Sequence, residues 1–561
     1  MITLAAASTA GGQNLNPTVE VTNQFVGKVM EVTKPGVEMA VPDSLLRFDL
    51  EFDYSVFDTP YKGTYEFSPY LLDIKPERDT WRGNGLYLRL GAGYALHPTA
   101  DLVYSPDLSG PFRLNVYGTH RSYVGDYKVR LGSIEADLKG YDMLSRAGVD
   151  GRYDYASGAF TFDAGYYGIH TKLAEGADAE NSAYNALDVK LRARSLAGPV
   201  EHFHYDVAAA FRGASQRYTP VRDLSTVDFN LDATAGPVFS DGHGILTDIH
   251  VGINSYSGLF SASTGILWVA PKYVLNANRW RIAAGVRAGT VIRSGDAWMG
   301  YVLGGQKGQY VYPDFRVGYE AVTDRLNLYV AVTGGDHVRS YSVQKEDNHF
   351  FNPLYGRNAA PLADNSVERI RASVGMQGNI ASKFRYDVRG GWLYVTNGLL
   401  DAVRAVRDDF ASAGSLAGRW VGSVAYEDYA QVFADADFVY DGRPVSVSGG
   451  IHFVNTDMSG LQYGFAPAST GRLEIAYNKM DRIRAGVRAE GALERAGGTD
   501  YRYLDLTIPG YVDLGLFGEY AVTRNLSLWL RADNLLNANI QRHPLCPESG
   551  ISVTGGIIFC M

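Results

Sequence analysis

The chain has 561 residues, of which 46% are hydrophobic and 20% charged, and its net charge is −9. This composition is close to that of soluble proteins, yet a membrane β-barrel reaches the same average because only alternate residues meet lipid. It excludes a helical membrane protein, since no apolar run approaches the roughly 20 residues that a membrane helix needs. The mild negative charge without a basic tract disfavours nucleic acid as a partner.

The N-terminal part of the chain differs from the rest. Residues 1–13 have an apolar core and end in small residues, which predicts a partial secretory signal peptide without its positively charged start. Residues 14–83 hold one alternating run, 46–54, among prolines and irregular sequence. We expect residues 14–83 to form an extended segment, periplasmic or against a lumen, with no core of its own.

From about residue 84, charged and apolar residues alternate. In residues 383–389, Lys, Arg, Asp and Arg take turns with Phe, Tyr and Val. Successive side chains of a strand point to opposite faces, so such a segment has one wet face and one apolar face. Similar runs lie at 112–117, 187–194, 280–287, 482–490 and 526–533. Roughly two dozen such segments follow one another, which predicts an all-β fold, a closed transmembrane antiparallel barrel over residues 84–561.

The polar face of these runs is expected to point into a hydrated lumen. One Arg or Lys facing lipid near the midplane would cost about 2–4 kcal/mol, and each run carries several. We also expect the sheet to close into a barrel, because an open sheet would leave backbone groups unpaired in hydrocarbon. The residues predicted to face the lumen are Arg192, Arg194, Arg385, Asp387, Arg389, Arg482, Arg484, Arg488, Glu490 and Arg531.

Turn signals separate the runs. Pairs of Asp, Asn or Ser with Gly predict tight turns at 150–151, 157–158, 241–242, 397–398 and 441–442. The longest stretches without alternation, 335–364 and 396–418, predict long extracellular loops, because the periplasmic turns of membrane barrels are short.

Aromatic residues lie near the ends of several runs, among them Trp392, Tyr394, Phe438, Tyr440 and Phe453. They predict girdles at the two membrane surfaces, with stacking on sugars as the alternative.

No motif indicates catalysis. The glycine-rich segment 304–308 lacks the Gly-Lys-Ser/Thr ending of a phosphate-binding loop, and the carboxylates of Asp435 and Asp437 fit an ordinary lumen wall. We therefore expect no enzyme activity, no cofactor and no metal. Cys546 and Cys560 are expected to be free thiols, with a disulfide between the last strands as the alternative.

The C-terminal fifth carries a family resemblance. Residues 509–515 read Pro-Gly-Tyr-Val-Asp-Leu-Gly, residues 531–537 read Arg-Ala-Asp-Asn-Leu-Leu-Asn, and residues 550–559 form a Gly-rich final run. This pattern resembles the closing strands of TonB-dependent outer-membrane receptors, especially those of Bacteroidetes. The resemblance implies a barrel of about 22 strands in the cell outer membrane. It also implies insertion by the barrel-assembly machinery, which recognises a terminal aromatic residue, here Phe559.

Receptors of this family carry a globular plug in front of the barrel, which binds substrate and responds to TonB. The segment 14–83 is too short for such a plug, which argues against energised import. A wide barrel with an empty lumen would be a large hole, so we expect residues 14–83 or the 335–364 loop to fold into it, or a partner to cover its mouth.

The sequence predicts passage or binding of a polar solute across the outer membrane. The alternative is a scaffold subunit, in complex with a lipoprotein or another outer-membrane subunit, without transport of its own.

Overall fold

The computed structural model describes residues 85–561 with internal gaps at 95–97, 109, 133, 175–180, 196–202, 219–221, 240–241, 259–260, 296–307, 352–364, 382, 406–419, 458–464, 480–481 and 500–504. The predicted signal peptide and the segment 14–83 lie outside the described residues.

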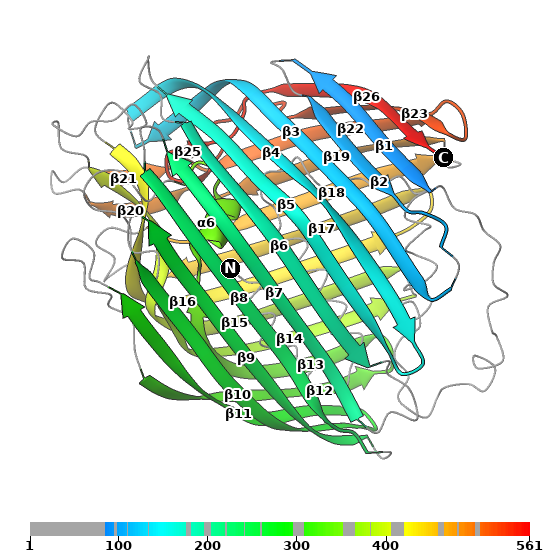
Figure 1. Cartoon of the computed structure of the whole chain (residues 1–561), viewed down its shortest axis with the longest axis vertical. Helices are drawn as coiled ribbons and strands as arrows, with labels where there is room; N and C mark the ends of the chain where they lie inside the picture. The colour runs from blue at the N-terminus through cyan, green and yellow to red at the C-terminus, as the bar shows by residue number, and fades with distance from the viewer. Residues whose placement is uncertain are drawn as a thin grey trace.

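Twenty-two strands form one antiparallel sheet. It closes into a barrel because β1 (Leu86–Gly93) pairs on one side with β2 (Thr99–Tyr104) and on the other with the last strand, β26 (Ser552–Cys560). The strands slant steeply around the wall (Figure 1). The prediction of a closed all-β barrel of about 22 strands is confirmed.

The remaining wall strands are β3 (Phe112–Leu131), β4 (Ile134–Tyr155), β5 (Gly158–Ala174), β6 (Asn181–Ser195), β7 (Phe203–Tyr218), β8 (Arg222–Pro237), β9 (His243–Gly258), β10 (Ala262–Ala277), β11 (Trp280–Gly295), β12 (Gly308–Val322), β13 (Leu326–Val338), β14 (Asn365–Ile380), β15 (Phe384–Ala405), β16 (Trp420–Asp441), β17 (Val445–Thr456), β18 (Thr470–Lys479), β19 (Ile483–Ala492), β22 (Tyr511–Ala521) and β23 (Leu526–Asp533). Outside this sheet lie the short helix α6 (Tyr341–Asp347) and two small hairpins, β20 (Arg495–Thr499) with β21 (Asp505–Ile508) and β24 (Gln541–His543) with β25 (Cys546–Pro547). Within the described part of the chain, no helix has the length and apolarity needed to cross a membrane.

The two ends of the barrel differ in the length of their connections. At the end where β1 begins and β26 finishes, the turns are short, as at 156–157, 278–279, 323–325 and 442–444. At the opposite end the connections include 296–307, 339–364, 406–419, 493–510 and 534–551. Because short turns face the periplasm in membrane barrels, we call the first end the periplasmic end and the second the outer end.

The outward face of the barrel suits lipid. Large apolar side chains such as Leu187, Val286 and Ile475 are exposed there at alternate strand positions. Aromatic rings gather on this face at the periplasmic end, where they pack in cross-strand pairs: Phe112 with Phe162 (centroids 6.4 Å apart), Trp280 with Tyr319 (4.8 Å) and Phe384 with Phe438 (6.3 Å). This belt is an aromatic girdle of the kind that anchors membrane proteins at the interface.

Two of the predicted turns are wrong. Asp150 and Gly151 lie inside β4. Gly151 is needed there for close packing, because a Cβ at this position would lie 2.3 Å from Cε1 of Phe162 on the neighbouring strand. Asn397 and Gly398 lie inside β15 at a register shift, and Asn397 takes a left-handed φ of 53°. This Asn-Gly pair makes a β-bulge, and the strand continues through it.

The pairs at 157–158 and 441–442 do lie at hairpin turns. Both predicted loops begin too early, because β13 extends to Val338 and β15 to Ala405. The strands of this barrel therefore continue beyond the point where the sequence alternation fades.

Candidate functional site: a loop seated in a charged lumen

Residues 339–351, here called the luminal loop, leave the outer end of β13 and turn into the barrel. Figure 1 shows its helix α6 inside the wall. The helix begins where Ser340 Oγ accepts a hydrogen bond from Val343 N, the usual arrangement of an N-cap serine. The expectation that part of 335–364 folds into the lumen is confirmed for the luminal loop.

Polar side chains of the wall hold the start of this loop. Tyr341 N donates to the hydroxyl of Tyr256 (3.1 Å) on β9, and the Tyr341 hydroxyl donates to Gln216 Oε1 (2.9 Å) on β7. Ser340 Oγ donates to Asp228 (3.0 Å) on β8. These bonds join residues more than 80 positions apart in sequence, so they exist only in the folded barrel.

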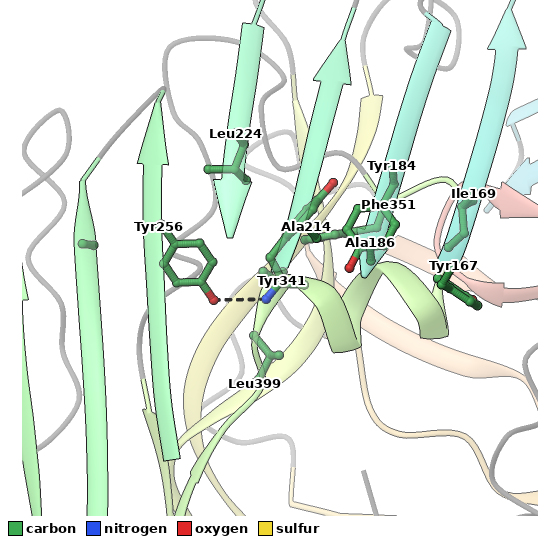
Figure 2. Close-up of a cluster of buried hydrophobic side chains, with 12 residues drawn as sticks. Tyr167, Ile169, Tyr184, Ala186, Ala214, Leu224, Tyr256, Tyr341, Phe351 and Leu399 are labelled. Atoms are coloured by element: carbon green, nitrogen blue, oxygen red, sulfur yellow. Dashed lines mark hydrogen bonds between the residues drawn. The ribbon is translucent and has the colours of Figure 1, made fainter. Parts of the chain in front are cut away.

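An apolar cluster crosses the lumen at the same level. Tyr341 and Phe351 of the luminal loop are buried between side chains of β5–β10 and two residues from the far wall, Leu399 of β15 and Val424 of β16. Figure 2 shows Tyr341 among Tyr256, Ala214 and Tyr184, with Leu399 nearby. The loop therefore bridges two walls of the barrel and obstructs the lumen near its outer end.

The end of the loop carries ionisable groups. Lys345 is fully buried, and its ammonium group donates to Ser182 Oγ (3.1 Å) and to the carbonyl oxygens of His349 (2.5 Å) and Phe351 (3.2 Å). Burial lowers the pKa of Lys345 to about 7, although Asp142 opposes the shift. His349 Nδ1 lies 2.9 Å from Asp142 on β4.

Glu346, on the same helix, forms an ion pair of 2.7 Å with Arg212 of β7. Arg212 also binds Asp188 of β6 through two hydrogen bonds of 2.5 and 2.7 Å. The charge that the loop brings into the lumen is therefore matched by the wall.

The luminal loop packs on the inner face of the wall. The strand registers show which residues of every other strand lie on the same inner face. Residues paired across neighbouring strands share a face, and the strand pairings lead from β1 through β26 and back to β1, with register shifts in the region of β12–β16. All the residues predicted to face the lumen lie on this face except Arg482. Arg482 is an exposed residue of the turn before β19 and is not part of the wall.

Ion pairs dominate this wall. Arg192 binds both carboxylate oxygens of Asp206 (2.8 and 2.5 Å). Arg389 binds Asp435 (2.8 Å), which also contacts His452. Paired side by side, these charges are balanced within the protein.

The other predicted wall residues follow the same pattern in part. Asp533 accepts from both Arg488 (2.9 Å) and Arg531 (2.8 Å), and Glu490 pairs with Arg542 of the β24 hairpin (2.5 Å). Asp387 accepts from the hydroxyl of Tyr329 (3.0 Å). Arg194 lies opposite Asp206 in register, Arg385 is exposed, and the guanidinium carbon of Arg484 lies 5.7 Å from the ring centre of Phe517.

The two small hairpins complete the cover at the outer end. Asp401, beyond the bulge of β15, binds Arg495 of β20 (3.2 Å) and His543 of β24 (3.0 Å). Gln541 Nε2 donates to the carbonyl of Arg130 on β3 (2.8 Å). Hairpins distant in sequence are thus fastened to opposite parts of the wall.

Both cysteines are free thiols, as predicted. Cys546 lies in the β24–β25 hairpin near Asn348 and Lys345 of the luminal loop, and burial raises its pKa to about 12. Cys560 lies at the periplasmic end of β26, next to Phe559, whose strand neighbours are Leu88 and Leu526. Among the described residues, no group of three or more His, Cys, Asp or Glu is placed to hold a metal ion.

Comparison with known proteins identifies the fold only. No family model and no curated protein matches the sequence. Solved structures match over most of the chain. The copper transporter OprC is 13% identical, with a TM-score of 0.61 over 85% of this chain and 80% of its own. The FrpB iron transporter from Neisseria meningitidis is 10% identical (TM-score 0.62, 85% and 81%), and the ferric-catecholate import receptor Fiu from K12 E. coli is 10% identical (0.59, 85% and 82%).

At this identity the likeness establishes a shared 22-strand barrel. The proteins that share it are transporters and receptors. A closed barrel of this architecture supports a place for this chain in the outer membrane.

Proposed function

We propose that the protein passes or binds a polar solute through its lumen in the cell outer membrane, and that the luminal loop closes the outer mouth until it moves. No covalent chemistry is part of this proposal. In it, the paired Arg, Asp and Glu residues of the wall offer a polar path, since a polar solute can exchange hydrogen bonds with them.

The observation that carries the proposal is the seat of the luminal loop. The loop is held by hydrogen bonds and ion pairs to β4–β9, and its two aromatic residues fill the space up to β15 and β16. A wall of this circumference encloses a wide lumen, so a segment lodged across it controls what can pass. The contacts that hold this segment are non-covalent, so the segment can leave its seat while the wall stays folded.

A disulfide tests the gate. The hydroxyls of Ser342 on the loop and Thr226 on β8 lie 3.2 Å apart, within reach of a disulfide in the double variant S342C/T226C. In planar bilayers we expect rare, small openings when this variant is oxidised and more frequent openings after reduction. The matched control is S263C/S294C, whose hydroxyls are 2.6 Å apart within the wall and should not affect conductance.

Replacement of residues 340–350 by a flexible linker is the complementary experiment. The linker variant should give a steady conductance several-fold above that of the unmodified protein. If the linker variant conducts no better than the unmodified protein, and if the full chain copurifies with a stoichiometric outer-membrane subunit, the transport proposal fails in favour of a scaffold.

A further inference from the structure

The turns at the periplasmic end divide into two groups. Six consecutive turns at this end, from the β10–β11 turn to the β22–β23 turn, each contain one basic residue. These residues are Arg279, Arg325, Lys383, Arg443, Arg482 and Arg524. The four turns on the other half of this end, at 105–111, 156–157, 196–202 and 238–242, contain neither Lys nor Arg. The bases therefore line one continuous half of the rim, here called the basic rim.

These six side chains are exposed and take no part in an ion pair or hydrogen bond with the rest of the described chain. That sets them apart from the arginines of the lumen wall, most of which bind a carboxylate. Asp324 and Asp481 are the acids in the same turns, so positive charge is in excess. The basic rim is therefore a stretch of unneutralised positive charge that is open to ligands outside the described barrel.

The neighbours of the basic rim indicate where it sits. Arg279 directly precedes Trp280 and Lys383 precedes Phe384, both members of the aromatic girdle. The hydroxyl of Tyr386, on the same outward face, donates to the carbonyl of Arg325 (2.9 Å). Aromatic rings of such girdles lie at the level of the lipid headgroups, so the basic side chains beside them reach the phosphates.

We propose that the basic rim binds anionic phospholipid headgroups of the periplasmic leaflet and so fixes the depth and tilt of this half of the barrel. Each guanidinium or ammonium group would face a lipid phosphate, and the rings of Trp280, Phe384 and Tyr386 would pack on the glycerol and upper acyl carbons. Attraction between exposed bases and anionic lipid is additive over residues and screened by salt. The inference depends on the barrel lying in a membrane and not on any transport.

Native mass spectrometry of the full-length protein tests the proposal. The protein is released from nanodiscs that contain phosphatidylcholine with or without phosphatidylglycerol, and the retained lipids are counted. The unmodified protein should retain phosphatidylglycerol in preference to phosphatidylcholine. The rim variant R279Q/R325Q/R443Q/R524Q should lose most of that preference, several-fold in bound lipid, because each change removes a charge and no structural contact.

A matched control removes the same number of exposed bases at the outer end, in the variant K128Q/R130Q/K139Q/R217Q. It should retain phosphatidylglycerol like the unmodified protein. Added salt should abolish the preference of the unmodified protein for phosphatidylglycerol, which tests the proposal without any variant. Equal retention by the rim and control variants, or no preference in the unmodified protein, would overturn the proposal and leave the rim to an acidic protein partner.

Discussion

The outer and periplasmic ends of the barrel treat their charges in opposite ways. At the outer end, Glu346 and Asp401 are directed inward and each meets partners from distant strands or hairpins. At the periplasmic end, the bases of the basic rim are exposed and meet no partner among the described residues. The charged groups of the outer end thus form internal contacts that hold the loops in place, whereas the bases of the rim are available to ligands outside the protein.

This difference follows from the cost of burial. A charge removed from water is stable only if it is paired and hydrogen-bonded, so the loops that fold into the lumen must bring complementary groups with them. A charge on a short turn stays hydrated, so it has no desolvation cost and needs no partner within the protein. Changes at the outer end should therefore have large effects on closure, and changes in the hydrated wall small ones.

The largest effect is expected for Tyr341→Ala. The side chain is fully buried at the centre of the cluster that crosses the lumen, and truncation of such an aromatic residue costs about 3–5 kcal/mol. We expect the luminal loop to leave its seat and the open fraction in planar bilayers to rise strongly. Tyr341→Phe, which keeps the ring and loses the bond to Gln216, should cost about 1 kcal/mol and open the barrel far less. Equal conductance of the two variants would contradict the role of the cluster.

Asp401→Asn should have the next largest effect. The carboxylate of Asp401 binds both Arg495 and His543, so its loss leaves the guanidinium of Arg495, itself only 7% exposed, without its acid. We expect about 2 kcal/mol less stability of the outer hairpins. Faster proteolysis between residues 493 and 551 would report it. Asp223→Asn, which touches only an exposed ion pair with Arg217, is the control and should change nothing measurable.

Lys345 should make closure depend on pH. Its pKa is about 7 in the seated loop, below the ordinary lysine value of about 10.5. Between these two values the released loop binds a proton that the seated loop does not, so seating is weakest below pH 7 and strengthens as pH rises. The limiting slope is about 1.4 kcal/mol per pH unit. Open fraction in bilayers should fall from pH 7 to pH 9. Lys345→Met should remove this dependence and Lys128→Met, at an exposed outer site, should not.

The smallest effect is expected for Arg192→Gln. The ion pair of Arg192 with Asp206 has good geometry, but the Arg192 side chain is 32% exposed to the hydrated lumen. Such pairs contribute about 1 kcal/mol or less. Unfolding of the variant in urea, followed in lipid vesicles, should differ from that of the unmodified protein by no more than this. A loss of several kcal/mol would show that the wall is drier than we infer.

Much of the fold could be predicted because strand alternation is a local property. The alternation in 383–389 already separates the face of Asp387 and Arg389 from that of Phe384 and Tyr386, and the structure keeps this separation. The prediction failed where the same dipeptide occurs in more than one kind of local structure. Asp-Gly at 150–151 and Asn-Gly at 397–398 fit tight turns equally well, but Gly151 serves close packing and Asn397 a bulge.

The contacts of the luminal loop could not be read in this way. Nothing near Gln216, Asp228 or Tyr256 marks them as partners of a segment about 100 residues away, because polar residues occupy nearly every alternate position of the wall. The six bases of the rim can be identified in the sequence as single residues. That they form one group follows only from the strand order, which brings their turns together.

The sequence by itself determined that this chain is a closed β-barrel with a polar interior, because each strand shows its own alternation of apolar and polar residues with a period of two. The tertiary structure alone decided which loop fills the lumen, which carboxylate meets which base, and which turns form one rim. These depend on strand order and register around the ring, which bring together residues that no local pattern connects.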